Sequence, residues 1–456
     1  MSAHDEGQDF GSPITRRTLL RTAGATGAAL AGGSLLAACG GSSGSSATTA
    51  AAAAGKITAD GQKLNSILGL SAQDVALTKG KTLHLGAVLP LTGPGAEYGV
   101  YQGNGLKLAV EQIQQAGGPK INLTVLDHKS GDPQAGAAAA RQLGIAGVGA
   151  VVASYIAVFG SMLPAVKRYQ MLTLDGGGGT GDGYQGAPFF YGTRALTPDD
   201  PFVGTYKYVA QKQPDWKSVA FVVWDAGAAF YNPLKAKLES ILASNGQKLV
   251  AFYPAKIGAT DFSSIIAKLK AADPDVVQLS IWGPDPGYFT KQARAAGLRA
   301  QIIGCEYTPT AVKVAQSAYD NYWFGMDIFD FKNPPNPLSK FFVDVYTKKY
   351  GEPPTMFYSP NYFETTLAFW DLARRTAKAG GDINKGTDLQ QQLLANPTFA
   401  SVYGGGDSTV GTFVLDKKTH SLATRPLGLF KAEGATIGFS PLATFDIGAK
   451  DFKVVA

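Results

Sequence analysis

From residue 81 onward, short apolar runs rich in β-branched residues alternate with amphipathic segments. The runs with strand character are 83–89, 121–126, 149–153, 171–174, 218–224, 249–253, 275–281 and 301–304. Between them, apolar residues recur at helical spacing, as with Leu106, Val110 and Ile113. Each helical segment is long enough for a right-handed crossover between parallel strands. The pattern therefore predicts an α/β fold with doubly wound parallel sheets.

The strand runs fall into two groups, which are separated near 192–201, a stretch with two prolines and no apolar period. Further crossings between the groups are expected near 322–329 and 428–434. Two lobes joined by three crossing strands form a hinge with a cleft between them. We expect lobe 1 to contain 81–196 with 328–428, and lobe 2 to contain 197–327 with 429–456.

The N-terminus has the order of an export signal. A twin arginine in 15–21 (TRRTLLR) is followed by an apolar run at 22–38 that ends in the sequence LAAC. This order resembles a bacterial twin-arginine signal closed by a lipobox, which implies removal of 1–38 and lipidation of Cys39. The alternative is a frayed terminus with a chance arginine pair. We expect anchoring by the lipid on the outer side of the cytoplasmic membrane.

Residues 39–80 are expected to form a flexible tether behind that anchor. Their first part, 40–55, is a low-complexity stretch of Gly, Ser, Thr and Ala. Further on, Ser71 and Asp74 have the spacing of a capping box, which predicts a short helix within 56–80. No function follows from that helix.

Composition and charge exclude several classes of function. Hydrophobic residues make up 45% and charged residues 17%, which is typical of a chain with a sizeable core. The net charge of +6 comes from interspersed basic residues, so nucleic-acid binding is not expected. The two cysteines, Cys39 and Cys305, and the four scattered histidines have no metal-ligand spacing, and we expect neither metal nor cofactor. No histidine lies on the strand-exit loops considered below, which argues against a hydrolase.

One loop has an unusually bare backbone. The stretch TLDGGGGTGDGY at 173–184 looks like a phosphate loop, but it lacks the G-K-[ST] ending of a nucleotide site. Such a backbone could instead let amide groups approach a small anion, for example a carboxylate.

Other strand-exit loops carry side chains that suit a small zwitterion. Ligands of open α/β sheets bind beyond the carboxyl ends of strands. A hydroxyl with free amides suits a carboxylate, an acid suits an ammonium group, and aromatic walls suit an apolar body. Each residue also has a structural alternative, as a helix cap, a core aromatic or a solvated acid. The candidates on these loops are Tyr98, Ser154, Tyr155, Asp225, Trp282 and Glu306.

The stretch LGAVLPLTGPGAEYGVYQGNGLKLAVEQIQQAGG at 85–118 resembles the opening of the leucine-binding protein family. These are the type I substrate-binding proteins of branched-chain amino acid ABC importers. The similarity continues through PDVVQLSIWGPDPGYFTKQARAAGL and YSPNYFETTLAFWDLARR and covers roughly 81–450. It implies a non-enzymatic, monomeric receptor that delivers a small molecule to permease and ATPase subunits.

The resemblance also implies a site. The ligand carboxylate is expected on loops of the first lobe, and its ammonium group on an acid of the second lobe. The residues concerned are Ser154, Tyr155, Gly177 and Gly178 for the carboxylate, Glu306 for the ammonium group, and Tyr98 and Trp282 for the cleft walls.

The chain departs from the family pattern at two places. Glycines, with Thr180 further on, replace a hydroxyl residue of the second carboxylate loop. After the loop that begins at Asp225, Ala229 or Phe230 takes the place of a tyrosine. An aromatic or other organic acid, or an amide, is therefore an alternative ligand, and ligand sensing is an alternative role.

Overall fold

The computed structural model describes residues 57–177, 184–194, 199–327, 329–406, 409–447 and 452–454. The expected signal, the lipidation site Cys39 and Gly178 of the glycine loop lie outside these ranges. Within them, no helix combines the length and the apolar composition that a membrane crossing requires.

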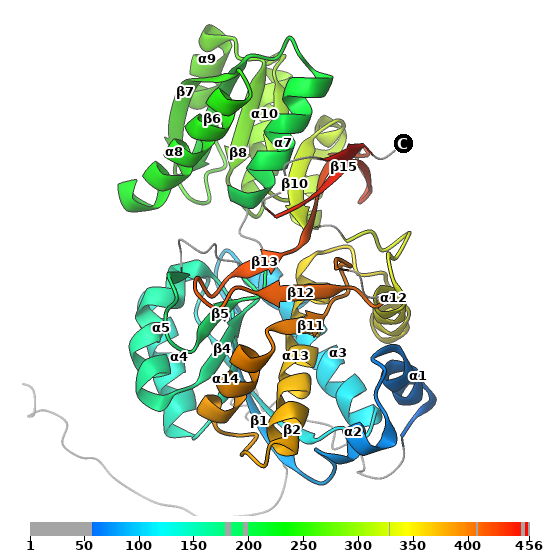
Figure 1. Cartoon of the computed structure of the whole chain (residues 1–456). Coiled ribbons are helices and arrows are strands. Elements are labelled where there is room, and N and C mark those ends of the chain that lie inside the picture. Colours follow the sequence, from blue (N-terminus) through cyan, green and yellow to red (C-terminus); the bar gives the residue numbers. More distant parts are fainter. Residues whose placement is uncertain are drawn as a thin grey trace, which may run out of the picture. The chain divides into compact units, whose positions relative to one another are not determined.

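The first lobe is built on a parallel sheet with the strand order β2-β1-β3-β4-β5 (Figure 1). Its strands are β1 (Thr82–Leu89), β2 (Lys120–Asp127), β3 (Ala150–Ala153), β4 (Leu172–Asp175) and β5 (Phe190–Gly192). Its helices are α3 (Ala96–Gln115), α4 (Pro133–Ile145), α5 (Ile156–Tyr169), α12 (Pro337–Tyr350), α13 (Tyr358–Lys378) and α14 (Gly386–Ala395). A small antiparallel sheet joins β11 (Thr398–Ala400), β12 (Thr412–Leu415) and β13 (Leu422–Thr424).

The second lobe has the strand order β16-β15-β14-β10-β9-β8-β6-β7. The strands from β7 to β10 pair in parallel, whereas β14, β15 and β16 add antiparallel strands at one edge. These strands are β6 (Ser218–Trp224), β7 (Lys248–Ala255), β8 (Val276–Ser280), β9 (Gln301–Gly304), β10 (Trp323–Asp327), β14 (Pro426–Ala432), β15 (Phe439–Asp446) and β16 (Lys453–Val454). The helices are α7 (Asp199–Lys212), α8 (Ala228–Ser244), α9 (Ser263–Ala272), α10 (Asp285–Ala295) and α11 (Pro309–Ala315), followed by a 3-10 turn at Gln316–Tyr319.

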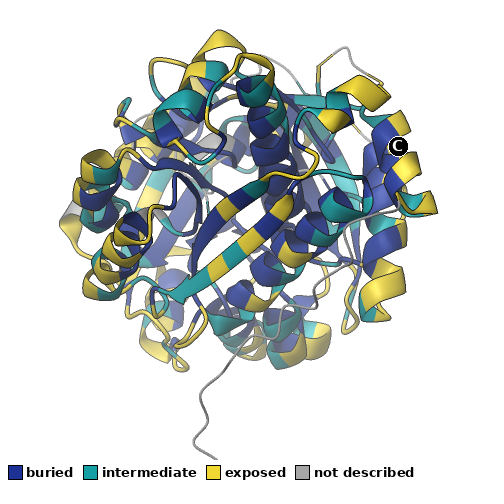
Figure 2. Cartoon of the chain, turned by 90° about the horizontal axis from the view of Figure 1, so that it is seen from below, coloured by how far each residue is buried: buried dark blue, intermediate teal, exposed yellow. Residues whose placement is uncertain are grey.

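The predicted doubly wound architecture with two lobes is confirmed. Residues of the central strands are buried, whereas the surrounding helices carry exposed residues on their outer faces (Figure 2). This arrangement follows from the sequence pattern, because continuous apolar strands need cover on both faces and the amphipathic helices supply it.

The chain passes between the two sheets three times. It leaves the first sheet after β5, returns after β10 and enters the second sheet again at β14. The third passage lies at Arg425, earlier than the 428–434 expected, because Leu427–Lys431 already pair with β10. Gly428 and Lys431 therefore lie inside strand β14, opposite Met326 and Trp323.

Buried ion pairs hold these crossing segments together. Arg194, which lies on the first passage, places Nε 3.0 Å from Oδ2 of Asp327 at the end of β10. Arg425, at the third passage, donates to the carbonyl of Thr193 over 2.7 Å and pairs with Glu364 of α13 at 2.6 Å. All four charged side chains are almost fully buried. The hinge is therefore a packed, charged network.

Residues 57–80 are ordered helices, so the expected flexible tether is wrong for this part of the chain. Helices α1 (Ala59–Ile67) and α2 (Ala72–Ala76) are capped by Thr58 and Ser71, and Ser71 forms the predicted capping box with Asp74. The buried side chain of Leu64 explains the order, because it anchors α1 on the body of the first lobe.

Candidate functional site

The carboxyl end of β1 leads to a buried tyrosine that reaches the second lobe. Tyr98 lies in the first turn of α3 and is 4% exposed. Its hydroxyl donates to Oε1 of Glu306, which follows β9, over 2.6 Å. The amide of Gly283, which follows β8, lies 2.5 Å from the same oxygen and 2.6 Å from the tyrosine oxygen. Two predicted site residues from different lobes therefore meet directly.

Glu306 is the most strongly perturbed acid at this contact. Its side chain is 2% exposed, and burial raises its pKa to about 8, although the bonds from Tyr98 and Gly283 oppose this shift. Its second oxygen, Oε2, is buried and has no hydrogen-bond partner among the described residues. A buried polar atom without a partner is costly, so this oxygen is a point at which a ligand could bind.

Aromatic rings surround the hydroxyl of Tyr98. Its ring lies edge-on to Tyr155 at 6.2 Å and to Tyr358 at 5.1 Å. The guanidinium of Arg194 lies over the ring of Tyr358, 4.6 Å from the ring centre. Tyr155 was a predicted site residue, whereas Tyr358 and Arg194 were not assigned from the sequence. Their signals were a tyrosine that opens the segment YSPNYFE and a lone arginine within a hinge crossing.

The glycine loop packs against the loop after β3. A Cβ atom on Gly177 would lie 2.2 Å from the nitrogen of Tyr155, so only glycine fits at this position. Ser154 is fully buried, and Tyr155 adopts a φ of 69°. This close approach of two backbone segments is a structural reason for glycine at position 177, beside the predicted contact with an anion. The amide of Gly177, however, donates to Asp175 over 2.6 Å rather than pointing freely at a ligand.

Asp175 is a second buried acid beside this loop. Tyr184 donates to its Oδ2 over 2.8 Å, and burial raises its pKa to about 6. Sequence reasoning did not assign it, because its position as the last residue of β4 looks the same as that of any strand-end acid.

Two of the remaining predicted residues, Trp282 and Phe230, belong to an aromatic group in the second lobe. The half-buried ring of Trp282 lies 4.9 Å from Trp224 and 6.2 Å from Phe230. Asp225 is exposed, and its carboxylate accepts a hydrogen bond from Gly227 of its own loop. The structure therefore joins Trp282 and Phe230 but does not bring Asp225 to Glu306.

One histidine does follow a strand. His128 comes directly after β2, and its ring centre lies 4.9 Å from that of Tyr155. Burial lowers its pKa to about 4, and Nδ1 accepts the amide of Gly131. The ring is thus neutral near pH 7, and it belongs to the aromatic wall.

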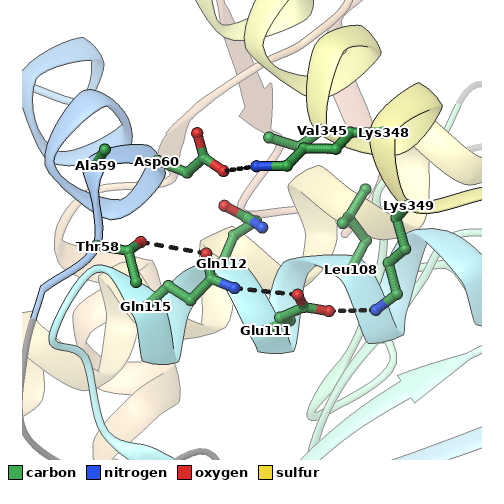
Figure 3. Close-up of a pocket in the computed structure, with 10 residues that line it drawn as sticks. All are labelled: Thr58, Ala59, Asp60, Leu108, Glu111, Gln112, Gln115, Val345, Lys348 and Lys349. Atoms are coloured by element: carbon green, nitrogen blue, oxygen red, sulfur yellow. Dashed lines mark hydrogen bonds and ion pairs between the residues drawn. The ribbon is translucent and has the colours of Figure 1, made fainter.

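A pocket of about 480 Å³ lies away from this contact, between α1, α3 and α12 (Figure 3). Lys348 pairs with Asp60 at 2.9 Å, and Lys349 pairs with Glu111, so its charged groups satisfy one another. None of the residues predicted for ligand binding lines it.

In the described ranges, no group of three or more His, Cys, Asp or Glu side chains is placed to hold a metal ion. The polar groups at the contact between the lobes include the hydroxyl of Tyr98, backbone amides and the carboxyls of Glu306 and Glu97. They can bind a small polar molecule by hydrogen bonds.

Two relatives are named as an amino acid-binding protein and as a homologue of one. The chain is 27% identical over 310 residues to the leucine-, isoleucine-, valine-, threonine- and alanine-binding protein of Pseudomonas aeruginosa, covering 66% of this chain and 79% of that protein. It is 30% identical over 230 residues to Leu/Ile/Val-binding protein homolog 1 of Brucella abortus, covering 48% of this chain and 59% of that protein.

Solved structures share the fold. The substrate-binding protein of a branched-chain amino acid transporter from Streptococcus pneumoniae, in complex with isoleucine, matches with a TM-score of 0.68 and 20% identity, over 82% of this chain and 99% of that one. A solute-binding protein from R. palustris in complex with benzoate matches with a TM-score of 0.65 and 18% identity, over 80% and 96%.

The sequence model of the periplasmic binding protein family matches residues 82–436, which is well over half of the chain. This match spans both lobes and the three passages between them. The chain therefore belongs to the periplasmic binding protein family.

Proposed function

We propose that this protein is the ligand-binding component of an ABC importer and captures a small carboxylate, with a branched-chain type of amino acid as the first candidate. The observation that carries this proposal is the buried carboxyl of Glu306, with one oxygen unpartnered, where the two lobes meet. The relatives named above support the ligand class. The protein acts by binding and release, without chemistry on the ligand.

The ligand would be held from both lobes. Its ammonium group would bond Oε2 of Glu306, and a positive charge at that distance favours the ionised carboxyl, against the effect of burial. Its carboxylate would lie near Ser154, Tyr155 and Gly177, and its apolar side chain against the rings of the site. Binding that bridges the lobes favours the closed state, which is the state that docks on the permease.

An aromatic or other organic acid is the second candidate. The pKa of about 8 keeps the Glu306 carboxyl protonated near pH 7, and a protonated carboxyl donates a hydrogen bond to an oxygen of the ligand instead of binding an ammonium group. The rings of Tyr98, Tyr155 and Tyr358 offer a wall for an aromatic body.

A ligand screen separates the two candidates. The purified protein would be mixed with free amino acids, benzoates and their amides, and the melting temperature recorded, because a ligand stabilises the folded state by mass action. Calorimetry with Glu306→Ala follows for each hit, with Asp225→Ala as the matched acidic control. Tight binding of neutral or purely acidic compounds that Glu306→Ala leaves unchanged would exclude the amino-acid proposal.

We further propose that the mature protein is a lipoprotein exported through the twin-arginine route and anchored through Cys39. The support is the order of twin arginine, apolar run and LAAC in the sequence. Cys39→Ala should move the protein from the membrane fraction to the soluble fraction of cells, and an Arg16→Lys, Arg17→Lys double variant should retain it inside. Membrane retention of Cys39→Ala would contradict the anchor.

A further inference from the structure

We propose that Tyr98, Glu306 and Gly283 form a latch, a set of hydrogen bonds within the protein that holds the two lobes closed. The latch forms without ligand, and a bound ligand then stabilises the closed state further. The inference rests on the proposed function, because it concerns the regulation of the same site. It assigns Tyr98 a role between the lobes, in addition to any contact with the ligand.

The latch is made entirely of protein atoms. The hydroxyl of Tyr98 belongs to the first lobe, whereas the carboxyl of Glu306 and the amide of Gly283 belong to loops of the second lobe. The three polar atoms lie within 2.6 Å of one another. Hydrogen bonds in a buried, low-dielectric setting are stronger than at the surface, and they cooperate when they form a network.

Both halves of the latch are held in place before they meet. Tyr358 and Tyr155 pack edge-on against the ring of Tyr98. On the other side, the carbonyl of Gly283 accepts a bond from Thr308, whose hydroxyl also caps α11. Little side-chain freedom is therefore lost when the latch forms, which lowers the cost of closing.

Gly283 has the backbone conformation that the latch requires. Its φ of +67° is one that residues with a Cβ rarely adopt, and a Cβ there would lie 3.7 Å from the hydroxyl of Tyr98. A contact at 3.7 Å is an ordinary one, so the positive φ, and not a lack of space, is what favours glycine here, and this backbone conformation turns its amide toward Glu306.

A second bond between the lobes lies beside the latch and offers an independent reporter. The amide of Thr310, at the start of α11, donates to Oε1 of Glu97 in the first turn of α3 over 3.3 Å. It shares no atom with the latch. It breaks when the lobes separate, when α3 moves or when the Glu97 side chain rotates away.

The latch divides the two oxygens of Glu306 between two tasks. Oε1 accepts both bonds of the latch, and Oε2 is left for the ligand. A protein whose closed state is already populated binds its ligand with an apparent affinity closer to the intrinsic one. Loss of the latch should therefore weaken binding even of a ligand that never contacts Tyr98.

Hydrogen exchange on the ligand-free full chain tests the latch. Tyr98→Phe should speed exchange of the amides of Gly283 and Thr310 by about 3- to 10-fold, the range expected for the loss of one buried hydrogen bond. Glu306→Gln should leave both near the wild-type rate, because the amide oxygen still accepts. Tyr101→Phe on the same helix is the control, since the hydroxyl of Tyr101 has no hydrogen bond with the described residues.

Unchanged exchange at Thr310 in Tyr98→Phe would overturn the latch, even if Gly283 alone responds. Should Tyr98→Phe lose its native circular dichroism, Glu306→Ala takes its place. Faster exchange of the Thr310 amide in Glu306→Ala would then support the latch, and unchanged exchange would overturn it. The proposed function fails separately, if no carboxylate ligand binds the wild-type protein while the exchange results hold.

Discussion

Glu306 and Glu364 are both buried carboxyls, yet their surroundings differ. Glu364 pairs with Arg425 and accepts hydrogen bonds from the hydroxyl of Ser401 and the amide of Val402. Glu306 has two donors on one oxygen and takes part in no ion pair among the described residues. Burial raises the pKa of both carboxyls, but only Glu364 has a neighbouring arginine that strongly opposes the shift.

The difference separates a structural acid from a binding acid. The hinge acid is neutralised by the chain itself, so the segments it joins stay together whether or not the site is occupied. The acid at the contact between the lobes is left with an unmet hydrogen-bonding oxygen, which stabilises whichever partner satisfies it. Substitutions at the two positions should therefore affect different properties, namely stability at Glu364 and binding at Glu306.

The largest expected effect is on the hinge. Arg425→Ala leaves the carboxyl of Glu364 buried without its cation and should lower the free energy of unfolding by about 3–5 kcal/mol. Denaturant unfolding measures it. Arg299→Ala removes an exposed pair with Asp273 and should cost less than about 1 kcal/mol. Equal losses of unfolding free energy in the two variants would show that the buried pair of Arg425 and Glu364 is no more important for stability than an exposed pair.

Binding should respond next, and at Glu306. Glu306→Ala should weaken binding of an amino acid by about 10- to 100-fold, the effect of losing a hydrogen bond to a charged group. Titration calorimetry measures it at constant pH. Native-like stability in this variant would support a role in binding for Glu306 and a role in stability for Glu364. A loss of unfolding free energy as large as that of Arg425→Ala would contradict this division.

A smaller effect should appear in the pH dependence of stability. The pKa of Glu306 rises from an ordinary 4.5 to about 8 on folding, so the folded state binds more protons in this window and stability falls as pH rises from about 4.5 to about 8. Glu306→Gln cannot ionise. Its melting temperature relative to the wild type should therefore increase between pH 5 and pH 9, and a constant difference would contradict the raised pKa.

The smallest effect is expected at Asp225. This exposed acid bonds only within its own loop among the described residues, so Asp225→Ala should change the free energy of unfolding by less than about 0.5 kcal/mol. The same titrations should show a ligand affinity within about twofold of the wild type. A loss comparable to that of Glu306→Ala would show that both acids hold the ligand.

Local pattern was enough to predict most of the fold. The runs 218–224 and 301–304 coincide with β6 and β9, and the Ser71–Asp74 spacing predicts the cap of α2. These features depend on periodicity and on hydrogen bonds between near neighbours, which the sequence shows directly. The flexible tether was predicted to run too far, to residue 80. Helix α1, with its buried Leu64, is held by packing against α3, which lies some 30 residues later and which the local sequence of α1 does not reveal.

Only part of the candidate site could be predicted from local sequence pattern. Tyr98 and Glu306 stand at strand exits, where α/β sheets bind ligands, so position alone selected them. Arg194 and Tyr358 join the site through a cation–ring contact across 164 residues, and no local pattern announces such a pair. The third passage between the lobes was expected near 428–434, but the pairing of Leu427–Lys431 with β10 places it earlier, and a pairing between such distant segments leaves no local pattern in the sequence.

The position of Trp282 gives the protein an optical property. This indole directly precedes Gly283, is half-buried and lies against Trp224 and Phe230. Indole emission shifts in wavelength and intensity with the polarity and mobility of its surroundings. Opening and closing of the lobes at Gly283 should therefore shift the wavelength or intensity of the protein's intrinsic tryptophan fluorescence. The movement could then be followed in real time without an attached dye.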